Sequence, residues 1–481
     1  MAVAGAAMDH DEFRRHGYAL VDWIADYLTN PTRYPVLPRV APGAVRAALP
    51  DRAPDEAEPF DEIIADFERV LVPALTHWNH PGFFAYFPTS SSAPAILAEF
   101  LAAAINQQAM LWRTSPAATE LEEVSLGWLR RLVGLPDAFE GVIYDTASIS
   151  TLHGLAAARE ARVAGVRQHG LPGREDVPRL RVYCSAQAHS SVDKAVILLG
   201  FGHDALCRIP TDAQFAMNAD ALARAIDDDI AAGVLPVAVV ATLGTTSTTS
   251  IDPVATIADI CAARGVWLHV DAAYAGVAAM LPDVRVRFAG WERADSIVIN
   301  PHKWLFVPVD LSAFYCRRMD VVRTAFSLVP DYLQTSDTGV RNLMDTGIQL
   351  GRRFRALKLW MTLRHLGAAE VRRVLSRHIE LAQQFASRVD GHPDFERVAP
   401  VSFSVVCFRA RPPEIANEEL DGFNERLLDA VNASGDVFLS HTRLHGRFVL
   451  RLAIGHLFTT GEHVERAWSL LTAHTAGLVG K

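Results

Sequence analysis

The spacing of apolar residues divides the chain into parts with different expected structures. In the first part, apolar residues recur at helical spacing over residues 16–28, 94–105 and 117–133, which is typical of amphipathic helices. The Pro-rich residues 30–59 show no period. We expect this segment to lie across another surface, because a long passage without periodic structure does not fold alone.

From about residue 140, short β-branched runs alternate with Ala-rich helical patterns. Such alternation predicts a mostly parallel sheet that is covered by helices on both faces. The expected strands are residues 141–144, 181–184, 237–242, 266–270, 296–299 and 312–315, and the expected helices are 150–164, 191–199, 219–232 and 253–264.

After about residue 350 the order becomes helix, then strand, over residues 352–366, 368–389, 402–408, 417–433, 448–453 and 461–475. This order predicts a smaller α+β domain. We therefore expect an α/β protein with an N-terminal helical extension (residues 1–85), a large α/β domain (86–355) and a small C-terminal α+β domain (356–481).

Composition excludes several classes of protein. The net charge of -9 argues against a nucleic-acid binder. The five cysteines are scattered without a CxxC pair, so neither a disulfide framework nor a cysteine zinc site is expected. The first residues lack the features of a secretory signal, and the apolar stretch at 234–243 is too short to span a bilayer. We expect a soluble, cytoplasmic protein with no membrane and no nucleic-acid partner.

Polar residues follow several of the expected strands, where ligands bind in open α/β sheets. A turn with small hydroxyl residues, residues 145–150, could bind a phosphate through free N–H groups or could be a plain helix cap. His189 could be a structural histidine, Thr245 and Thr246 could belong to a polar loop, and Asp271 could be a helix cap, a metal ligand or a charge partner.

Lys303 follows the strand expected at 296–299 and precedes a Trp. It could be a surface lysine, but a lysine in apolar surroundings has a lowered pKa and can form a Schiff base. A carboxylate can hold the proton of a pyridine nitrogen, and the 145–150 turn can hold a phosphate. Together these groups match the requirements of pyridoxal 5'-phosphate. Asp271 has no second carboxylate nearby in sequence, so no metal site is expected.

Six ordered motifs resemble the group II pyridoxal-phosphate decarboxylases, and most closely the aromatic L-amino acid decarboxylases. These motifs are DTASISTLHGLAAARE, AHSSVDKA, LGTTS, HVDAAYAG, NPHKWL and LGRRFRALKLW. WNHPGFFAYFPTSSS and SPAATELEE are similar to N-terminal signatures of the same family. The resemblance extends from the first helix to about residue 454.

The resemblance implies fold type I of the pyridoxal-phosphate enzymes, which is aspartate aminotransferase-like. It also implies a homodimer with active sites at the subunit interface, in which the N-terminal extension packs on the partner. Lys303 would carry the cofactor as a covalent aldimine, Asp271 would pair with the ring nitrogen, His189 would stack on the ring, and Thr246 and His302 would lie close to it. The other implied residues are Thr146, Ala147, Ser148, Ala273 and Asn300 for the cofactor, and Tyr86, Phe87, Pro88, Thr89, Gln108, Met110, Leu343 and Gly351 for the substrate.

One segment departs from the family pattern. Residues 336–349 contain no tyrosine, whereas the decarboxylases carry a mobile loop there whose tyrosine returns a proton to the substrate. Leu343 stands at the position that aligns with this tyrosine, and Tyr332 lies upstream of the loop. Gln108 and Met110 replace apolar and aromatic residues of the animal enzymes. Leucine cannot deliver a proton, so His189 or water would have to do so.

The motifs therefore predict a carboxy-lyase that converts an aromatic L-amino acid (tryptophan, phenylalanine, tyrosine or dopa) to its arylalkylamine and CO2. The missing tyrosine keeps an aromatic acetaldehyde synthase open as the alternative, because loss of that tyrosine favours oxidative decarboxylation–deamination. An aminotransferase or another lyase on the same fold also stays open, as does a non-catalytic paralogue. Gly351 suggests room for an indole, and the aromatic run FFAYFP suits an aromatic side chain.

Overall fold

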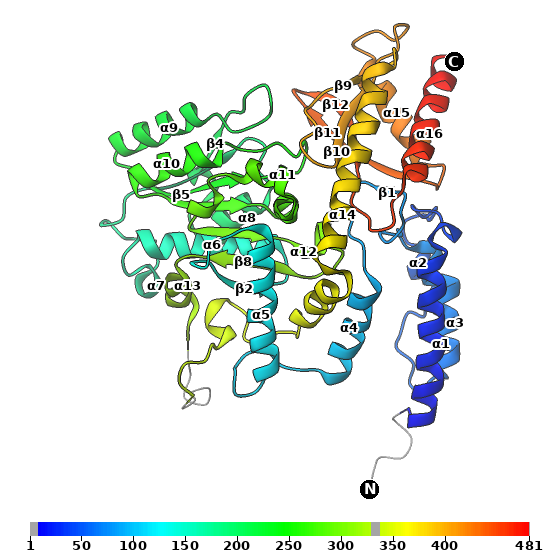
Figure 1. The fold of residues 1–481 in the computed structure, drawn as a ribbon, viewed down its shortest axis with the longest axis horizontal. Coiled ribbons are helices and arrows are strands. Elements are labelled where there is room, and N and C mark those ends of the chain that lie inside the picture. The colour runs from blue at the N-terminus through cyan, green and yellow to red at the C-terminus, as the bar shows by residue number, and fades with distance from the viewer. Residues whose placement is uncertain (1–7, 329–336, 481) are drawn as a thin grey trace.

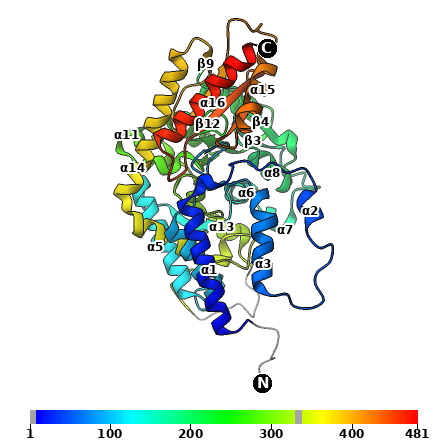
Figure 2. The same ribbon diagram turned by 90° about the vertical axis from the view of Figure 1, so that its right-hand side faces the viewer.

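The computed structural model describes residues 8–328 and 337–480. The chain begins with an arm of helices that stands beside the large domain (Figures 1 and 2). The arm consists of α1 (His10–Thr29), α2 (Ala44–Ala48) and α3 (Phe60–Asp66). Asp9 caps α1 by accepting the backbone N–H groups of Asp11 and Glu12, which explains why this helix starts where it does. His16 is the only buried residue of α1.

The large domain is built on a seven-stranded sheet with the order β2-β8-β7-β6-β5-β3-β4. All neighbours are parallel except β8, which runs antiparallel to both β2 and β7. The strands are β2 (Glu140–Tyr144), β3 (Leu180–Ser185), β4 (Leu206–Ile209), β5 (Leu235–Thr242), β6 (Trp267–Asp271), β7 (Ser296–Ile299) and β8 (Ser312–Cys316). The mostly parallel sheet and its six expected strands are confirmed, and β4 is an additional strand.

Helices cover both faces of this sheet (Figure 1). Alternate residues of several strands enter two separate hydrophobic clusters, as for Val142 and Ile143 of β2, because successive side chains of a strand point to opposite faces. The helices are α4 (Ala93–Ile105), α5 (Pro116–Val133), α6 (Ala147–Arg162), α7 (Val166–His169), α8 (Ser191–Leu198), α9 (Ala219–Ala231), α10 (Val254–Arg264), α11 (Pro282–Arg285), α12 (Pro301–Trp304) and α13 (Met319–Phe326).

The small domain packs α14 (Ala356–Gly391), α15 (Leu420–Asn432) and α16 (Gly461–Val479) against a five-stranded sheet. This sheet has the order β1-β11-β12-β10-β9, with β1 (Phe83–Phe84), β9 (Phe395–Arg397), β10 (Val405–Ala410), β11 (Phe438–Leu444) and β12 (Arg447–Ala453). Gly367 (φ 68°, ψ 162°) breaks α14, so the two helices expected there meet at this residue. β1 belongs to the segment expected as the N-terminal extension, yet it pairs with β11. The domain boundaries themselves stay a prediction.

Across residues 8–328 and 337–480, no helix combines the length and the apolar character that crossing a membrane requires.

Candidate active site

The parallel strands bring most of the predicted site residues to one edge of the large sheet. β2, β3, β5, β6 and β7 run in the same direction, so their carboxyl ends lie together. Asp271 is the last residue of β6, and Thr146, His189, Thr246 and Lys303 follow β2, β3, β5 and β7. The fold thus assembles groups that are far apart in the sequence.

Lys303 lies on the short helix α12, which begins at Pro301 directly after β7. The side chain is half-buried, and its Nζ lies 5.2 Å from the centre of the Phe87 ring. It forms no ion pair with any residue that the structure describes. Burial lowers the pKa of Lys303, and the charge of Asp271 opposes this shift. A lowered pKa increases the fraction of neutral amine, which is the nucleophilic form.

Asp271 and His189 share the neighbourhood of Lys303. Asp271 is 7% exposed, and its Oδ1 accepts the N–H of Ala273 at 3.0 Å. His189 follows β3 and is exposed in the single chain, with Nδ1 accepting the Ser191 N–H at 3.1 Å. Partial burial lowers the pKa of His189. The charge of Asp271 opposes this shift, and the charge of Lys303 adds to it. These effects indicate that the charges of Asp271 and Lys303 act on His189, and that the charge of Asp271 acts on Lys303.

The start of α6 offers unpaired backbone donors. Thr146 precedes the first turn in an extended conformation, and its side chain makes no cap. Its own N–H donates to Asp145 Oδ1 at 2.5 Å, whereas the N–H groups of Ala147 and Ser148 have no partner among the described residues. Because helix N-termini carry a partial positive charge, this turn can hold a phosphate.

Asn300 and His302 form a second polar group at the end of β7. Asn300 is 1% exposed, and its side-chain amide lies 3.3 Å from His302 Nε2. The Leu311 N–H donates to His302 Nδ1 at 2.9 Å, so a neutral His302 carries its proton on Nε2. Burial lowers the pKa of His302 to about 3, with Lys303 adding to the shift. Asn300 Oδ1 is buried without a partner among the described residues. Turning the amide so that Oδ1 accepts the His302 Nε2 proton frees the Asn300 NH2 group to donate to a ligand.

Arg451 of β12 joins the small domain to this site and was not predicted. It is 3% exposed and has no carboxylate partner within the described residues. It donates to the carbonyl oxygens of Thr246 (2.8 Å), Ser247 (2.8 Å) and Tyr86 (3.2 Å). A buried arginine must satisfy its donors in this way. The sequence signal for this buried contact is an arginine inside the apolar strand FVLRLA.

The segment from Tyr86 to Thr89, which was expected to line the substrate pocket, is only partly close to Lys303. Phe87 is buried and lies beside Lys303, with its ring stacked on Tyr274 at 3.8 Å. Pro88 is also buried, and Thr89 is partly buried. Tyr86 is 53% exposed and stacks on Trp78 instead.

The remaining predicted substrate residues form a separate group. Gln108 Oε1 accepts the N–H of Arg352, next to Gly351, at 2.6 Å. Met110 packs on Leu111 and Met344, and Leu343 is 1% exposed within the core that faces α6. No hydrogen bond, ion pair or ring contact joins these predicted residues to Lys303 in the described parts of the chain. Tyr332 and Ser336 lie outside the described residues.

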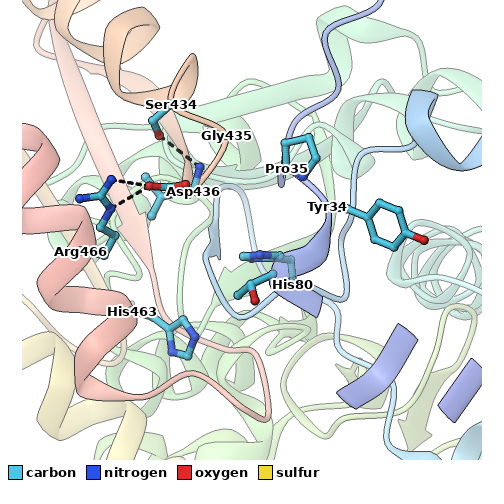
Figure 3. Close-up of a pocket in the computed structure, with 10 residues that line it drawn as sticks. Tyr34, Pro35, His80, Ser434, Gly435, Asp436, His463 and Arg466 are labelled. Atoms are coloured by element: carbon cyan, nitrogen blue, oxygen red, sulfur yellow. Dashed lines mark hydrogen bonds and ion pairs between the residues drawn. The ribbon is translucent and has the colours of Figure 1, made fainter. Parts of the chain in front are cut away.

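A hollow of about 310 Å³ lies elsewhere, between the N-terminal segment and the small domain (Figure 3). It is lined by His80, His463 and the Asp436–Arg466 ion pair, among others. Burial lowers the pKa of His80 to about 4. None of the predicted site residues lines this hollow, so it is distinct from the candidate active site.

The residues at the sheet edge fit the cofactor that the motifs predict. The start of α6 supplies donors for a phosphate, Asp271 Oδ2 accepts no hydrogen bond from any residue that the structure describes, and Lys303 supplies an unpaired amine. The buried amide atom of Asn300 also lacks a protein partner. A phosphorylated pyridine aldehyde would satisfy each of these groups.

Comparisons with known proteins lead to the same cofactor. The family model described as the pyridoxal-dependent decarboxylase conserved domain matches residues 42–411. Phenylacetaldehyde synthase from Arabidopsis thaliana is 39% identical to this chain, and the alignment covers 98% of each protein. Aromatic-L-amino-acid decarboxylase from Sus scrofa is 41% identical, and that alignment covers 98% of this chain and 97% of the porcine protein. The solved structure of Oryza sativa TDC with PLP and tryptamine superposes with a TM-score of 0.94 at 37% identity, covering 98% of this chain and 99% of that one.

Proposed function

The chain belongs to the pyridoxal-dependent decarboxylases, and we propose that tryptophan, phenylalanine, tyrosine or dopa is its substrate. The fold is fold type I, the cofactor is pyridoxal 5'-phosphate, and the enzyme is a carboxy-lyase that acts on an aromatic L-amino acid. The products are the corresponding arylalkylamine and CO2. Relatives with decarboxylase names, among them the porcine enzyme, support the reaction.

The observation that carries the proposal is the half-buried, unpaired Lys303, with Asp271 and His189 around it. When bound, pyridoxal phosphate accepts the electron pair of the breaking Cα–CO2 bond. Lys303 would hold the cofactor through its amine and release it when the substrate amine takes its place. Asp271 would keep a proton on the ring nitrogen through Oδ2, while its Oδ1 stays bonded to the Ala273 N–H.

The other predicted residues would position the cofactor and its charge. Thr146, Ala147 and Ser148 would donate to the phosphate from the start of α6, together with the Asn300 amide that His302 orients. His189 would cover the ring on the solvent side and Thr246 would line the carboxylate side, with its backbone held by Arg451.

The second candidate function is an aromatic acetaldehyde synthase, and the segment at residues 336–349 favours it because it contains no tyrosine. Such an enzyme consumes O2 and water and releases the aldehyde, CO2, ammonia and hydrogen peroxide. The similarity to the Arabidopsis thaliana phenylacetaldehyde synthase is compatible with this outcome. In a decarboxylase without that tyrosine, His189 or water must return the proton to Cα.

We expect the purified protein, supplied with pyridoxal phosphate and each of the four amino acids, to form amine and CO2 in equal amounts. Mass spectrometry identifies the organic product, and peroxide and ammonia are assayed in parallel. Aldehyde with stoichiometric peroxide and ammonia would replace the decarboxylase assignment by the synthase. A 2-oxo acid in stoichiometric yield would contradict both.

We further infer that the enzyme is a homodimer whose partner completes the substrate pocket. Two observations support this inference: the separate group around Gln108 and Gly351, and the uncovered apolar side of α1, where Phe13 is 60% and Tyr18 67% exposed. A partner subunit that covers this side would bury both rings.

The dimer is tested by light scattering, which should give twice the chain mass of 52.6 kDa. Phe13→Glu combined with Tyr18→Glu should yield a folded monomer with little turnover. Ile230→Glu on α9, which changes a 46% exposed side chain, is the matched control and should stay dimeric. A monomeric wild-type protein with full turnover would contradict the inference.

A further inference from the structure

Three aromatic rings form a continuous column beside Lys303. Phe87 stacks on Tyr274 with a centroid distance of 3.8 Å and an interplanar angle of 16°. Tyr274 stacks on Trp304 at 4.8 Å and 5°. The Lys303 Nζ lies 5.2 Å from the Phe87 centroid, at the end of this column. The plane of Phe87 therefore depends on the two rings behind it and on the Arg451 guanidinium, whose Cζ lies 5.5 Å from the Phe87 centroid.

His378 of α14 holds the opposite end of the column. Its Nδ1 accepts the indole N–H of Trp304 at 3.0 Å, and the two rings are nearly parallel, at 8°. Both side chains are at most 1% exposed. Burial lowers the pKa of His378 to about 4, so the ring is neutral at physiological pH and Nδ1 remains an acceptor. An indole nitrogen can only donate, and a buried donor without an acceptor is destabilising.

The small domain also contacts the middle of the column. The hydroxyl group of Tyr274 is hydrogen-bonded to Ser404 Oγ. The edge of Phe403 packs against Trp304 at 6.4 Å and 83°. His378, Phe403 and Ser404 thus fix the rings from one side, while Lys303 lies at the other end. A change at His378 therefore reaches Lys303 through Trp304, either along the backbone of α12, where Lys303 directly precedes Trp304, or through the rings of Tyr274 and Phe87.

We propose that His378 is a positioning residue for Lys303. This proposal rests on the proposed function of Lys303. By orienting Trp304, it sets the planes of Tyr274 and Phe87 and hence the aromatic face against which the lysine amine lies. This face attracts the ammonium form through a cation–π interaction and fixes where Nζ stands. Covalent chemistry requires that placement, because small displacements of reacting atoms reduce rates strongly.

The test compares two substitutions of similar size. His378→Asn keeps an acceptor for the indole N–H, whereas His378→Leu removes it. We expect kcat of the leucine variant to fall by about 10- to 100-fold with little change in KM, and the asparagine variant to recover most of it. His392→Leu is the control, because His392 caps the end of the same helix and its ring accepts the Asp394 N–H and packs on Phe395 and Trp468, outside the column.

A second readout uses the cofactor-free protein and therefore does not depend on turnover. The pH dependence of Lys303 acetylation, mapped by mass spectrometry with the exposed Lys194 as internal standard, reports the pKa of Lys303. Loss of the ordered aromatic face destabilises the ammonium form, so His378→Leu should lower this pKa by about half a unit. A histidine that merely filled the core would leave it unchanged.

Trp304→Phe supplies an internal check, because it removes the indole donor that His378 accepts. Adding His378→Leu to Trp304→Phe should then change kcat and the pKa of Lys303 no further. Wild-type kcat and pKa in folded His378→Leu would overturn the proposal, as would an additive effect in the double variant. A wild-type protein without turnover would instead refute the proposed function, while the acetylation measurement would still decide the role of His378.

Discussion

Replacing Lys303 by alanine is expected to remove the yellow colour of the purified enzyme and to reduce turnover by about 10⁴-fold or more. The expected loss is that of a covalent nucleophile, which no neighbouring group replaces. Absorption spectroscopy and product formation from an aromatic amino acid measure the two effects. Persistent turnover of Lys303→Ala would show that the central assignment is wrong.

Because the chain contains few lysines, the residue that carries the cofactor can be identified without ambiguity. The four lysines are Lys194, Lys303, Lys358 and Lys481. Lys358 is 1% exposed, but it donates to the Pro308 carbonyl oxygen at 3.0 Å and pairs with Glu99 at 2.5 Å. Lys358→Met should therefore reduce stability and keep the colour. Borohydride reduction of the holoenzyme should label Lys303 and leave Lys194 unlabelled.

The sequence predicted the strand ends of the large sheet because the relevant signals are local. In each case an apolar β-branched run stops at a polar residue, such as Asp271 or Asn300. Because the strands are parallel, their carboxyl ends then lie at the same edge of the sheet. The cluster of Asp271, His189 and Lys303 follows from strand direction alone. Parallel strands covered on both faces are almost entirely apolar, which makes them easy to recognise.

Three strands of the small sheet, β1, β9 and β11, were not predicted. β9 has only three residues, and β11 reads FLSHTRL, with exposed or partly exposed positions at His441, Thr442 and Arg443. Antiparallel strands that face solvent on one side carry polar residues, so their apolar content resembles that of a loop. The pairing of β1 with β11 joins residues 355 positions apart (Phe83 with Phe438), which no local pattern reveals.

Arg451 and His378 were not predicted because their roles arise from contacts between distant segments. His378 does leave a local trace, since it occupies an apolar stripe of α14 together with Leu375, Ala382 and Phe385. A single histidine in such a stripe indicates a buried polar contact. Its partner Trp304 lies 74 residues away, so the sequence could indicate that a contact exists but not which residue makes it.

Asp271→Asn is expected to lower kcat by about 100- to 1,000-fold, because it removes a preorganised charge from the reacting centre. The substitution keeps the shape of the side chain. An asparagine Oδ1 can still accept the Ala273 N–H, which lies 3.0 Å from Asp271 Oδ1. The loop should therefore stay folded while the charge that would hold the proton on the ring nitrogen is lost. Turnover within tenfold of the wild type would contradict the assigned role.

The same variant changes Lys303 in the cofactor-free protein, and the direction of the change is fixed. Burial lowers the pKa of Lys303, whereas the negative charge of Asp271 raises it. Removing that charge leaves burial unopposed, so the pH midpoint of Lys303 acetylation should move to lower pH. Asp295→Asn is the matched control: Asp295 is partly buried before the start of β7, and its Oδ2 accepts the Leu268 N–H at 2.8 Å. Asp295 precedes β7 and Lys303 follows β7, so the charge of Asp295 lies at the opposite edge of the sheet. Removing this charge should leave both kcat and the pH midpoint of Lys303 acetylation unchanged.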